Sequence, residues 1–241
     1  MTTIFPARDK HDLVSKVAHR FVELVSEIQN IGGGSHDDGI VRVVLTGGTS
    51  GIAVLEALAA TPDSDIEWSG VHFFFGDERN LAISDKESNE GQARRAFLDQ
   101  LDIPETNIHG YGLTGADDLT ERAQEYTAML EKFAPAGFDI HLAGVGDDGH
   151  INSLFPHHAG LKDNSAVISV TDSPKPPAQR LSLGLKKVAQ SDRIWLLAAG
   201  QNKSEAIARL VSTTSPDASC PATLVHGRIE TLLFSDVIPA H

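Results

Sequence analysis

The chain has 241 residues, of which 41% are hydrophobic, and its 33 acidic and 20 basic residues give a formal net charge of −13. This length is ample for one large α/β domain. The acidic balance argues against nucleic acid and anionic lipid as partners, because both repel a negative surface.

The chain shows no targeting or membrane signal. No stretch approaches the roughly 20 apolar residues that a membrane span needs, and residues 1–10 lack the pattern of a signal peptide. The single cysteine, Cys220, excludes an intrachain disulfide, which agrees with a reducing compartment. We therefore expect a cytoplasmic protein, and we interpret Cys220 as a small buried or half-buried thiol.

The first part of the chain predicts a helix, a strand–turn–helix unit and a further strand. Apolar residues recur at helical spacing from Val14 to Ile28, and Asp12 is placed to cap this helix. A short apolar run, Val41–Leu45, leads through a glycine-rich turn into a helix over 52–60. The run Val71–Phe75 is apolar almost throughout, which is typical of a strand covered on both faces.

The same patterns continue to the end of the chain. They predict helices over 88–101, 117–133 and 202–211, and strands over 138–143, 166–170, 180–185, 193–199 and 231–235. Strands that alternate with helices indicate an α/β fold with a mostly parallel open sheet and helices on both faces. The proline-rich stretch 171–177 is interpreted as a loop and not as a linker, so one domain over 1–241 is the simplest organisation.

Ligands of such sheets bind beyond the carboxyl ends of the strands, and three strand ends carry unusual residues. The first is the loop 46–51, with the sequence TGGTSG. Gly47 and Gly48 let the backbone approach a ligand, and the following helix N-terminus favours an anion, with Thr49 and Ser50 as hydroxyl donors. The alternative is an ordinary capped turn. The loop is not a P-loop, because no Gly-Lys-Ser/Thr follows it.

The second strand end is Gly76-Asp77-Glu78-Arg79-Asn80, directly after Val71–Phe75. Three charged residues at the end of a buried strand are hard to explain by packing. The planar guanidinium of Arg79 suits recognition of an anion or oxyanion, and Asp77 is a candidate to orient a partner or act as a base. The alternative is a solvated turn with a local ion pair.

The third strand end is the loop 144–150, with the sequence GVGDDGH. It satisfies the spacing G-x-G-x-x-G, but Pro156 follows too soon for the helix that a dinucleotide site needs, and two aspartates repel a pyrophosphate. NAD is therefore rejected. The loop makes better sense as a mount for His150, a candidate general base, with Asp148 placed to fix its tautomer. No metal-binding spacing supports the alternative of a metal site.

Two basic residues complete the candidates. Arg180 opens a predicted strand after the proline loop, and Lys203 follows Gly200-Gln201-Asn202 at the start of a helix. Each of them, taken alone, is more often a surface charge than a ligand-binding group.

Taken in order, these segments resemble the 6-phosphogluconolactonases, within the wider family that also holds the glucosamine-6-phosphate deaminases. The matching segments span Leu45 to Ala222, and the most specific is the stretch from Gly144 to Pro156. They are LTGGT at 45–49, FGDER at 75–79, SN at 88–89, GVGDDGHINSLFP at 144–156, KPP at 175–177 with Arg180, Gly200 with Lys203, and PA at 221–222.

The resemblance implies a Rossmann-like sheet, as in the glucosamine-6-phosphate deaminase/ribose-5-phosphate isomerase group, and hydrolysis of a phosphorylated sugar lactone without cofactor or metal. It implies that the lactone ring lies between Asp77, Arg79 and His150. The implied phosphate site comprises Gly47, Gly48, Thr49, Ser50, Arg180 and Lys203. The implied partner is a small sugar phosphate. We expect the assembly to be a monomer or a weak homodimer.

Some positions depart from the family pattern. The loop reads Gly48-Thr49-Ser50-Gly51, where the family commonly has Ser-Thr-Pro after the glycines, and residues 80–87 lack the prolines and histidine often found there. The deaminases carry a Glu five positions after the histidine, where this chain has Phe155, and they lack the arginine of Asp-Glu-Arg. These two differences from the deaminases favour a lactonase over a deaminase or sugar-phosphate isomerase. A sugar-phosphate sensor on the same fold is the non-enzymatic alternative.

Overall fold

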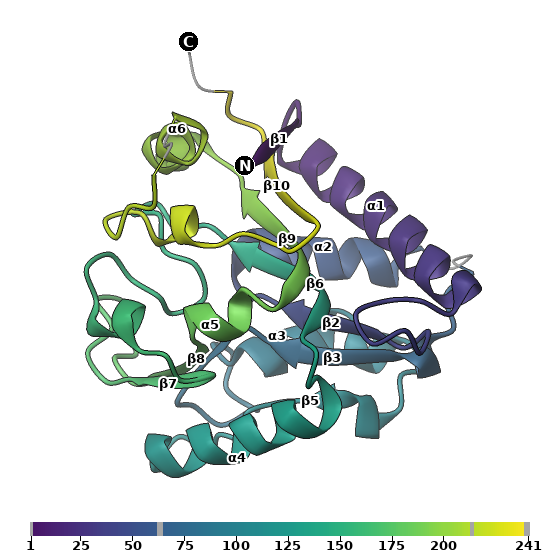
Figure 1. Cartoon of the computed structure of the whole chain (residues 1–241), viewed down its shortest axis with the longest axis horizontal. Coiled ribbons are helices and arrows are strands. Elements are labelled where there is room, and N and C mark those ends of the chain that lie inside the picture. Colours follow the sequence, from purple (N-terminus) through teal and green to yellow (C-terminus); the bar gives the residue numbers. More distant parts are fainter. Residues whose placement is uncertain (1, 62–64, 213–214, 239–241) are drawn as a thin grey trace.

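The computed structural model describes residues 2–61, 65–212 and 215–238. Its centre is a seven-stranded parallel sheet with the strand order β1-β10-β9-β6-β2-β3-β5 (Figure 1). The strands are β1 (Thr3–Pro6), β2 (Val41–Leu45), β3 (Val71–Phe75), β5 (Ile108–His109), β6 (Phe138–Gly144), β9 (Ser191–Ala198) and β10 (Glu230–Ser235).

A second, smaller sheet accompanies it. Its order is β4-β8-β7, with antiparallel pairing of β4 (Asp77–Arg79), β8 (Arg180–Leu183) and β7 (Val167–Val170). The strands predicted over 166–170 and 180–185 therefore exist, but they lie outside the parallel sheet. The second ends at Leu183, because Gly184 caps a short helix.

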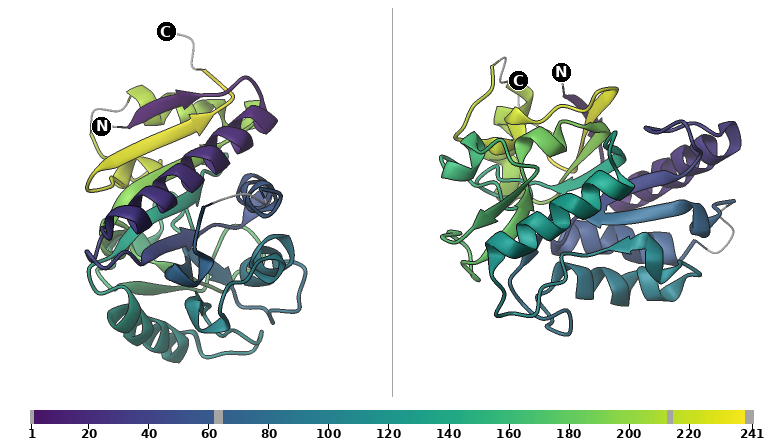
Figure 2. Two further views of the ribbon diagram at one scale, coloured as in Figure 1. Left: turned by 90° about the vertical axis from the view of Figure 1, so that its right-hand side faces the viewer. Right: turned by 60° about the horizontal axis from the view of Figure 1, so that its bottom comes forward.

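Helices lie on both faces of the parallel sheet, as predicted (Figures 1 and 2). They are α1 (Lys10–Ile31), α2 (Gly48–Ala59), α3 (Asn89–Ala96), α4 (Leu119–Phe133), α5 (Leu185–Val188) and α6 (Ser204–Ser212). The neighbours Phe73 and Phe74 on β3 show the two covered faces. Phe73 packs against Phe97 just after α3, while Phe74 contacts His109, whose ring lies against Phe133 at the end of α4.

Several boundaries differ from the sequence prediction. The N-cap of α1 is Asp9 and not Asp12, because the carboxylate of Asp9 accepts the N–H of Asp12 at 2.8 Å. Asp12 instead pairs with Arg8 and Lys16. Helix α2 begins at Gly48, four residues earlier than expected, so the glycine-rich loop is largely the first turn of the helix.

The strand register brings the functional loops to one edge. Leu45 at the end of β2 pairs with Phe75 at the end of β3, and Gly144 at the end of β6 pairs with Leu197 of β9. These four strands are adjacent in the sheet. The chain segments that follow them therefore meet above the same carboxyl edge. Within the described ranges, no helix is both long and apolar enough to cross a membrane.

Candidate functional site

A cavity of about 310 Å³ lies at this edge. Nine of the ten residues proposed from the sequence line it: Gly47, Gly48, Thr49, Ser50, Asp77, Arg79, His150, Arg180 and Lys203. The tenth, Asp148, lies behind His150 and bonds to it. The three loops that the sequence singled out are thus brought together by the tertiary structure.

The first wall of the cavity is the start of α2. Gly47 is the N-cap residue and Gly48 has φ +79, a left-handed conformation that suits glycine. A Cβ atom on Gly47 would lie 2.1 Å from Oδ1 of Asn89, so a larger residue here would displace the Asn89 side chain. The first turn of a helix offers unpaired N–H groups and a positive dipole end, which is a suitable environment for an anion.

The second wall is β4, which the sequence predicted to be a loop. The short strand forms because Asp77–Arg79 pairs with β8, a contact between segments far apart in the chain. Side chains alternate along a strand, so Asp77 and Arg79 line the cavity while Glu78 points to the other side. Ser153 donates a hydrogen bond to Oδ2 of Asp77 at 2.6 Å, and Asn89 donates to Oδ1 at 3.1 Å.

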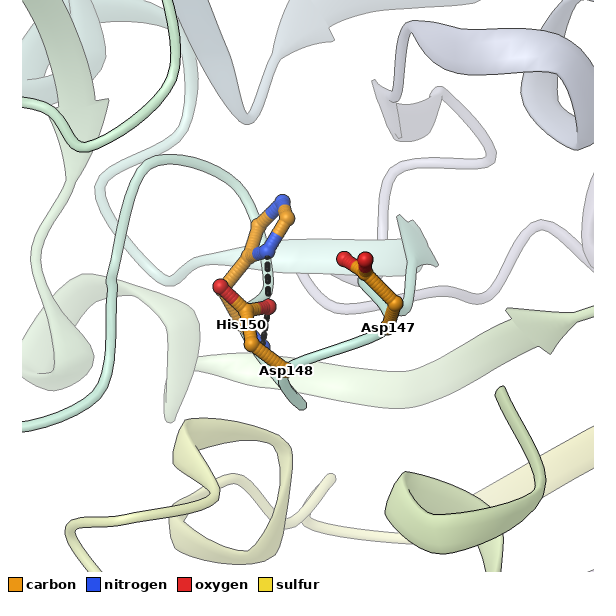
Figure 3. Close-up of side chains that lie close together, drawn as sticks. All are labelled: Asp147, Asp148 and His150. Carbon is orange, nitrogen blue, oxygen red and sulfur yellow. Dashed lines mark hydrogen bonds and ion pairs between the residues drawn. The ribbon is translucent and has the colours of Figure 1, made fainter. Parts of the chain in front are cut away.

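The third wall carries His150, whose Nδ1 lies 2.5 Å from Oδ1 of Asp148 (Figure 3). The same oxygen accepts the backbone N–H of His150 at 3.1 Å, and the ring packs against Phe155 at a centroid distance of 4.7 Å. Burial by itself raises the pKa of Asp148, but the hydrogen bond and charge of His150 outweigh it and hold the pKa below its usual value. A Cβ on Gly146 would lie 2.0 Å from Nδ1 of His150, so glycine makes room for the ring.

Basic side chains gather at the cavity despite the acidic balance of the whole chain. Arg79, Lys175, Arg180 and Lys203 all line it. Burial lowers the pKa of Lys203. Arg180 is buried and donates to the backbone oxygens of Lys175, Pro176 and Pro177, with its Nη1 3.9 Å from Oδ2 of Asp77. Arg180 therefore holds the proline loop in place, a role that the sequence did not suggest.

Several lining residues were not proposed from the sequence: Thr46, Asn89, Asn152 and Lys175. Asn89 and Lys175 lie in segments that carried the family resemblance, but nothing local assigned them a function. Asn152 has φ 48 and lies beside Gly76, where a Cβ would approach its Oδ1 to 2.3 Å. This proximity depends on the path of the loop after β6, which sequence patterns do not reveal.

Possible metal ligands also occur here. Ligand atoms of Asp147, Asp148 and His150 lie within 4.8 Å of one another. However, Asp148 is paired with His150 (Figure 3). Asp147 is paired with Lys175 at 2.6 Å, so both carboxylates already have partners. Cys220 is buried, as expected, and burial raises the pKa of its thiol, which is unfavourable for a nucleophile.

The fold and this cavity define an α/β protein with a helix N-terminus and basic side chains next to a histidine–carboxylate pair. Residues 8–234 match the family described as glucosamine-6-phosphate isomerases/6-phosphogluconolactonase. The chain belongs to this family.

Curated relatives of similar length support this membership. The 6-phosphogluconolactonase of Mycobacterium tuberculosis is 41% identical, covering 97% of this chain and 94% of the relative. That of Streptomyces coelicolor is 36% identical, covering 93% of both. The resemblance inferred from the sequence is therefore confirmed.

Solved structures confirm the fold class. The 6-phosphogluconolactonase of Thermotoga maritima superposes with a TM-score of 0.84 at 22% identity, covering 98% of this chain and 99% of that one. A monomeric glucosamine-6-phosphate deaminase superposes with a TM-score of 0.78 at 19% identity, covering 97% of both chains. Because both branches share the fold, the fold alone does not distinguish a lactonase from a deaminase.

Proposed function

We propose that the protein hydrolyses 6-phospho-D-glucono-1,5-lactone to 6-phospho-D-gluconate, the second step of the oxidative pentose phosphate pathway, with a water activated by His150 and no covalent intermediate. The relatives bear out the class of enzyme, a hydrolase acting on a lactone. The observation that carries the mechanism is the Asp148–His150 pair on one wall of a cavity that also holds a helix N-terminus and basic groups.

The histidine is proposed to act as the general base. An ionised Asp148 accepts a hydrogen bond from the protonated Nδ1 of His150, which leaves Nε2 with a lone pair. Nε2 takes a proton from water as the water oxygen bonds to C1 of the lactone. The tetrahedral intermediate then collapses, the bond from C1 to the ring oxygen breaks, and His150 returns its proton to that oxygen.

Arg79 is proposed to stabilise the oxyanion that forms at C1. Its Nε is buried and has no hydrogen-bond partner among the described atoms. A buried donor without a partner is costly unless a ligand provides one, and a fixed donor stabilises a developing negative charge. Asp77, held by Ser153 and Asn89, is proposed to bind sugar hydroxyls or orient Arg79.

The phosphate is proposed to lie on the first turn of α2, against Gly47, Gly48, Thr49 and Ser50, with Lys203 and Arg180 providing positive charge. The phosphate takes no part in the chemistry. Its binding energy positions C1 against His150, so a lactone without phosphate is expected to lose rate as well as affinity. Neither a cofactor nor a metal is required by this scheme.

The decisive assay follows the loss of freshly generated 6-phosphoglucono-δ-lactone, coupled to a 6-phosphogluconate dehydrogenase and corrected for spontaneous hydrolysis. We expect acceleration by the wild type and a roughly 10²–10⁴-fold lower turnover in His150→Ala, as for a lost general base. His158→Ala is the matched control, because His158 also pairs with an aspartate but lies outside the residues that line the cavity.

Three outcomes would change this assignment. No acceleration at high enzyme concentration would refute the lactonase activity, whereas full turnover in His150→Ala would remove only this base. Ammonia release from glucosamine 6-phosphate would revive the deaminase alternative, against which Phe155 argues.

The cellular setting is proposed from the sequence. We infer a cytoplasmic enzyme that acts as a monomer or a weak homodimer on a small sugar phosphate, with neither nucleic acid nor membrane as a partner. Analytical ultracentrifugation across a range of protein concentrations tests the assembly, and a stable higher oligomer would contradict it.

A further inference from the structure

Glu78 is a buried carboxylate between two cavity residues, Asp77 and Arg79, and it faces away from the cavity. Its side chain is only 3% exposed and accepts four hydrogen bonds. Oε1 accepts the backbone N–H groups of Arg79 and Asn89 at 2.8 Å each. Oε2 accepts the N–H of Glu90 at 2.8 Å and the hydroxyl of Ser88 at 3.0 Å. Each oxygen of this carboxylate thus accepts two hydrogen bonds.

One of these four donors, the N–H of Arg79, belongs to β4, and the other three belong to the beginning of α3. Asn89 and Glu90 are its first two residues and Ser88 is its N-cap, which itself accepts the N–H of Gly91. The first N–H groups of a helix lack partners within the helix, and a carboxylate there is favoured by the helix dipole. Glu78 therefore joins strand β4 to the first turn of α3 through the hydrogen bonds that its two carboxylate oxygens accept.

Burial outweighs the hydrogen bonds from the N–H groups of Glu90, Asn89 and Arg79, which lower the pKa of Glu78, so this pKa is raised to about 7. The ionised carboxylate satisfies all four donors, and these hydrogen bonds offset part of the cost of burying it. In a glutamine side chain of the same shape, an NH2 group would replace one carboxylate oxygen. Its N–H groups would then face donors that the carboxylate oxygen had accepted. The geometry consequently depends on the carboxylate and not only on the volume of the side chain.

The first turn of α3 carries groups that reach the cavity. Nδ2 of Asn89 donates to the backbone oxygen of Asp77 at 2.9 Å and to its carboxylate, and the side chain of Asn89 lies against Gly47. Arg79 donates through Nη1 to the backbone oxygen and carboxylate of Glu87, just before the N-cap. A shift of α3 relative to β4 would therefore move groups at both the proposed lactone end and the proposed phosphate end.

We propose that Glu78 is a positioning residue for lactone hydrolysis, which clamps α3 onto β4 and thereby holds Asp77, Arg79 and Asn89 in their catalytic arrangement. The proposal rests on the proposed function, since its consequence is measured as turnover. Glu78 itself lies outside the cavity lining and makes no contact with substrate in this scheme.

The test is Glu78→Gln, compared with Asp139→Asn. Asp139 is a fully buried carboxylate that accepts the backbone N–H groups of Ser35 and Arg42, and it lies near the beginning of β6, at the edge opposite the cavity. Both variants are expected to lower the melting temperature. Turnover, normalised to folded protein well below the melting temperature, is expected to fall roughly tenfold to a hundredfold in Glu78→Gln alone, because small displacements of catalytic groups are costly.

A double-mutant comparison identifies the route of the effect. If Glu78 acts through the first turn of α3, the effects of Glu78→Gln and Asn89→Ala on turnover should not be independent. The fold-loss of turnover in the double variant should then be smaller than the product of the fold-losses in the two single variants. If Glu78→Gln does not fold, Ser88→Ala removes one of the four donors and is expected to lower turnover in the same direction, by a smaller factor.

The outcomes separate this inference from the proposed function. An inactive wild type would refute the lactonase activity itself. An active wild type with unchanged turnover in Glu78→Gln, despite a lower melting temperature, would show that Glu78 is merely structural. An equal loss of turnover in Asp139→Asn would likewise overturn the positioning role, because it would trace the effect to general destabilisation.

Discussion

The substitution Asp148→Asn tests how the histidine is held. The bond from Nδ1 of His150 to Asp148 is 2.5 Å long and involves a carboxylate whose pKa is lowered by this contact. A hydrogen bond to a charged group contributes about 1.5–3 kcal/mol, which corresponds to roughly a 10- to 150-fold loss of turnover if it acts in the transition state. The amide that replaces the carboxylate also donates to Nδ1, which favours the tautomer whose Nε2 is already protonated.

The assay is the coupled lactone assay, with kcat and KM determined separately. Asp148 lies behind His150, so KM is expected to change little while kcat falls. Asp172→Asn is the matched control, because Asp172 bonds to Nε2 of His158 at 2.8 Å in a second histidine–carboxylate pair away from the cavity lining. A kcat within twofold of the wild type in Asp148→Asn would refute the orienting role of this carboxylate.

Three further predictions follow from the same structure. Lys203→Ala should raise KM for the phosphorylated lactone roughly tenfold or more, because one charged contact is lost. Hydrolysis of unphosphorylated gluconolactone should stay nearly unchanged. An equal effect on both substrates would contradict the assignment of Lys203 to the phosphate site. Gly47→Ala should lower both kcat/KM and the melting temperature, because the new Cβ would lie 2.1 Å from Oδ1 of Asn89, and wild-type values would show that the loop adjusts freely. Burial lowers the pKa of His141 from 6.5 to about 4, so the unfolded chain binds the extra proton between these values and stability is lost as the pH falls. Between pH 7 and pH 5 the free energy of unfolding, measured in urea, should decrease by about 2 kcal/mol more in the wild type than in His141→Gln, and equal decreases would argue against a neutral buried His141.

The sequence was most informative where a buried strand meets a polar loop. The apolar runs Val41–Leu45 and Val71–Phe75 were predicted with the bounds that the structure has. In parallel sheets the loops after such strands share one edge, so their glycines and charged residues were expected to converge. The cavity lining confirms this convergence for all the proposed residues except Asp148, which contacts His150 from behind.

Short elements escaped prediction because they carry no periodicity. Thr3–Pro6, Asp77–Arg79 and Ile108–His109 contain four, three and two residues, too few to show an alternating pattern. Their strand conformation depends on partners elsewhere in the chain. Asp77–Arg79 pairs with β8, roughly a hundred residues away by sequence number, so local residues gave no sign of it.

The amino-acid pattern by itself determined the α/β class, the main strands and the types of residue that meet at the cavity, because burial periodicity and turn chemistry are local properties. Only the tertiary structure decided what each charged side chain contacts. Arg180 bonds to the carbonyl oxygens of the proline loop, and Glu78 bonds to α3 instead of facing the cavity. These contacts join segments far apart in the chain. The orientation of a charged side chain depends on which partner the fold brings within hydrogen-bonding distance, and the sequence pattern does not show that partner.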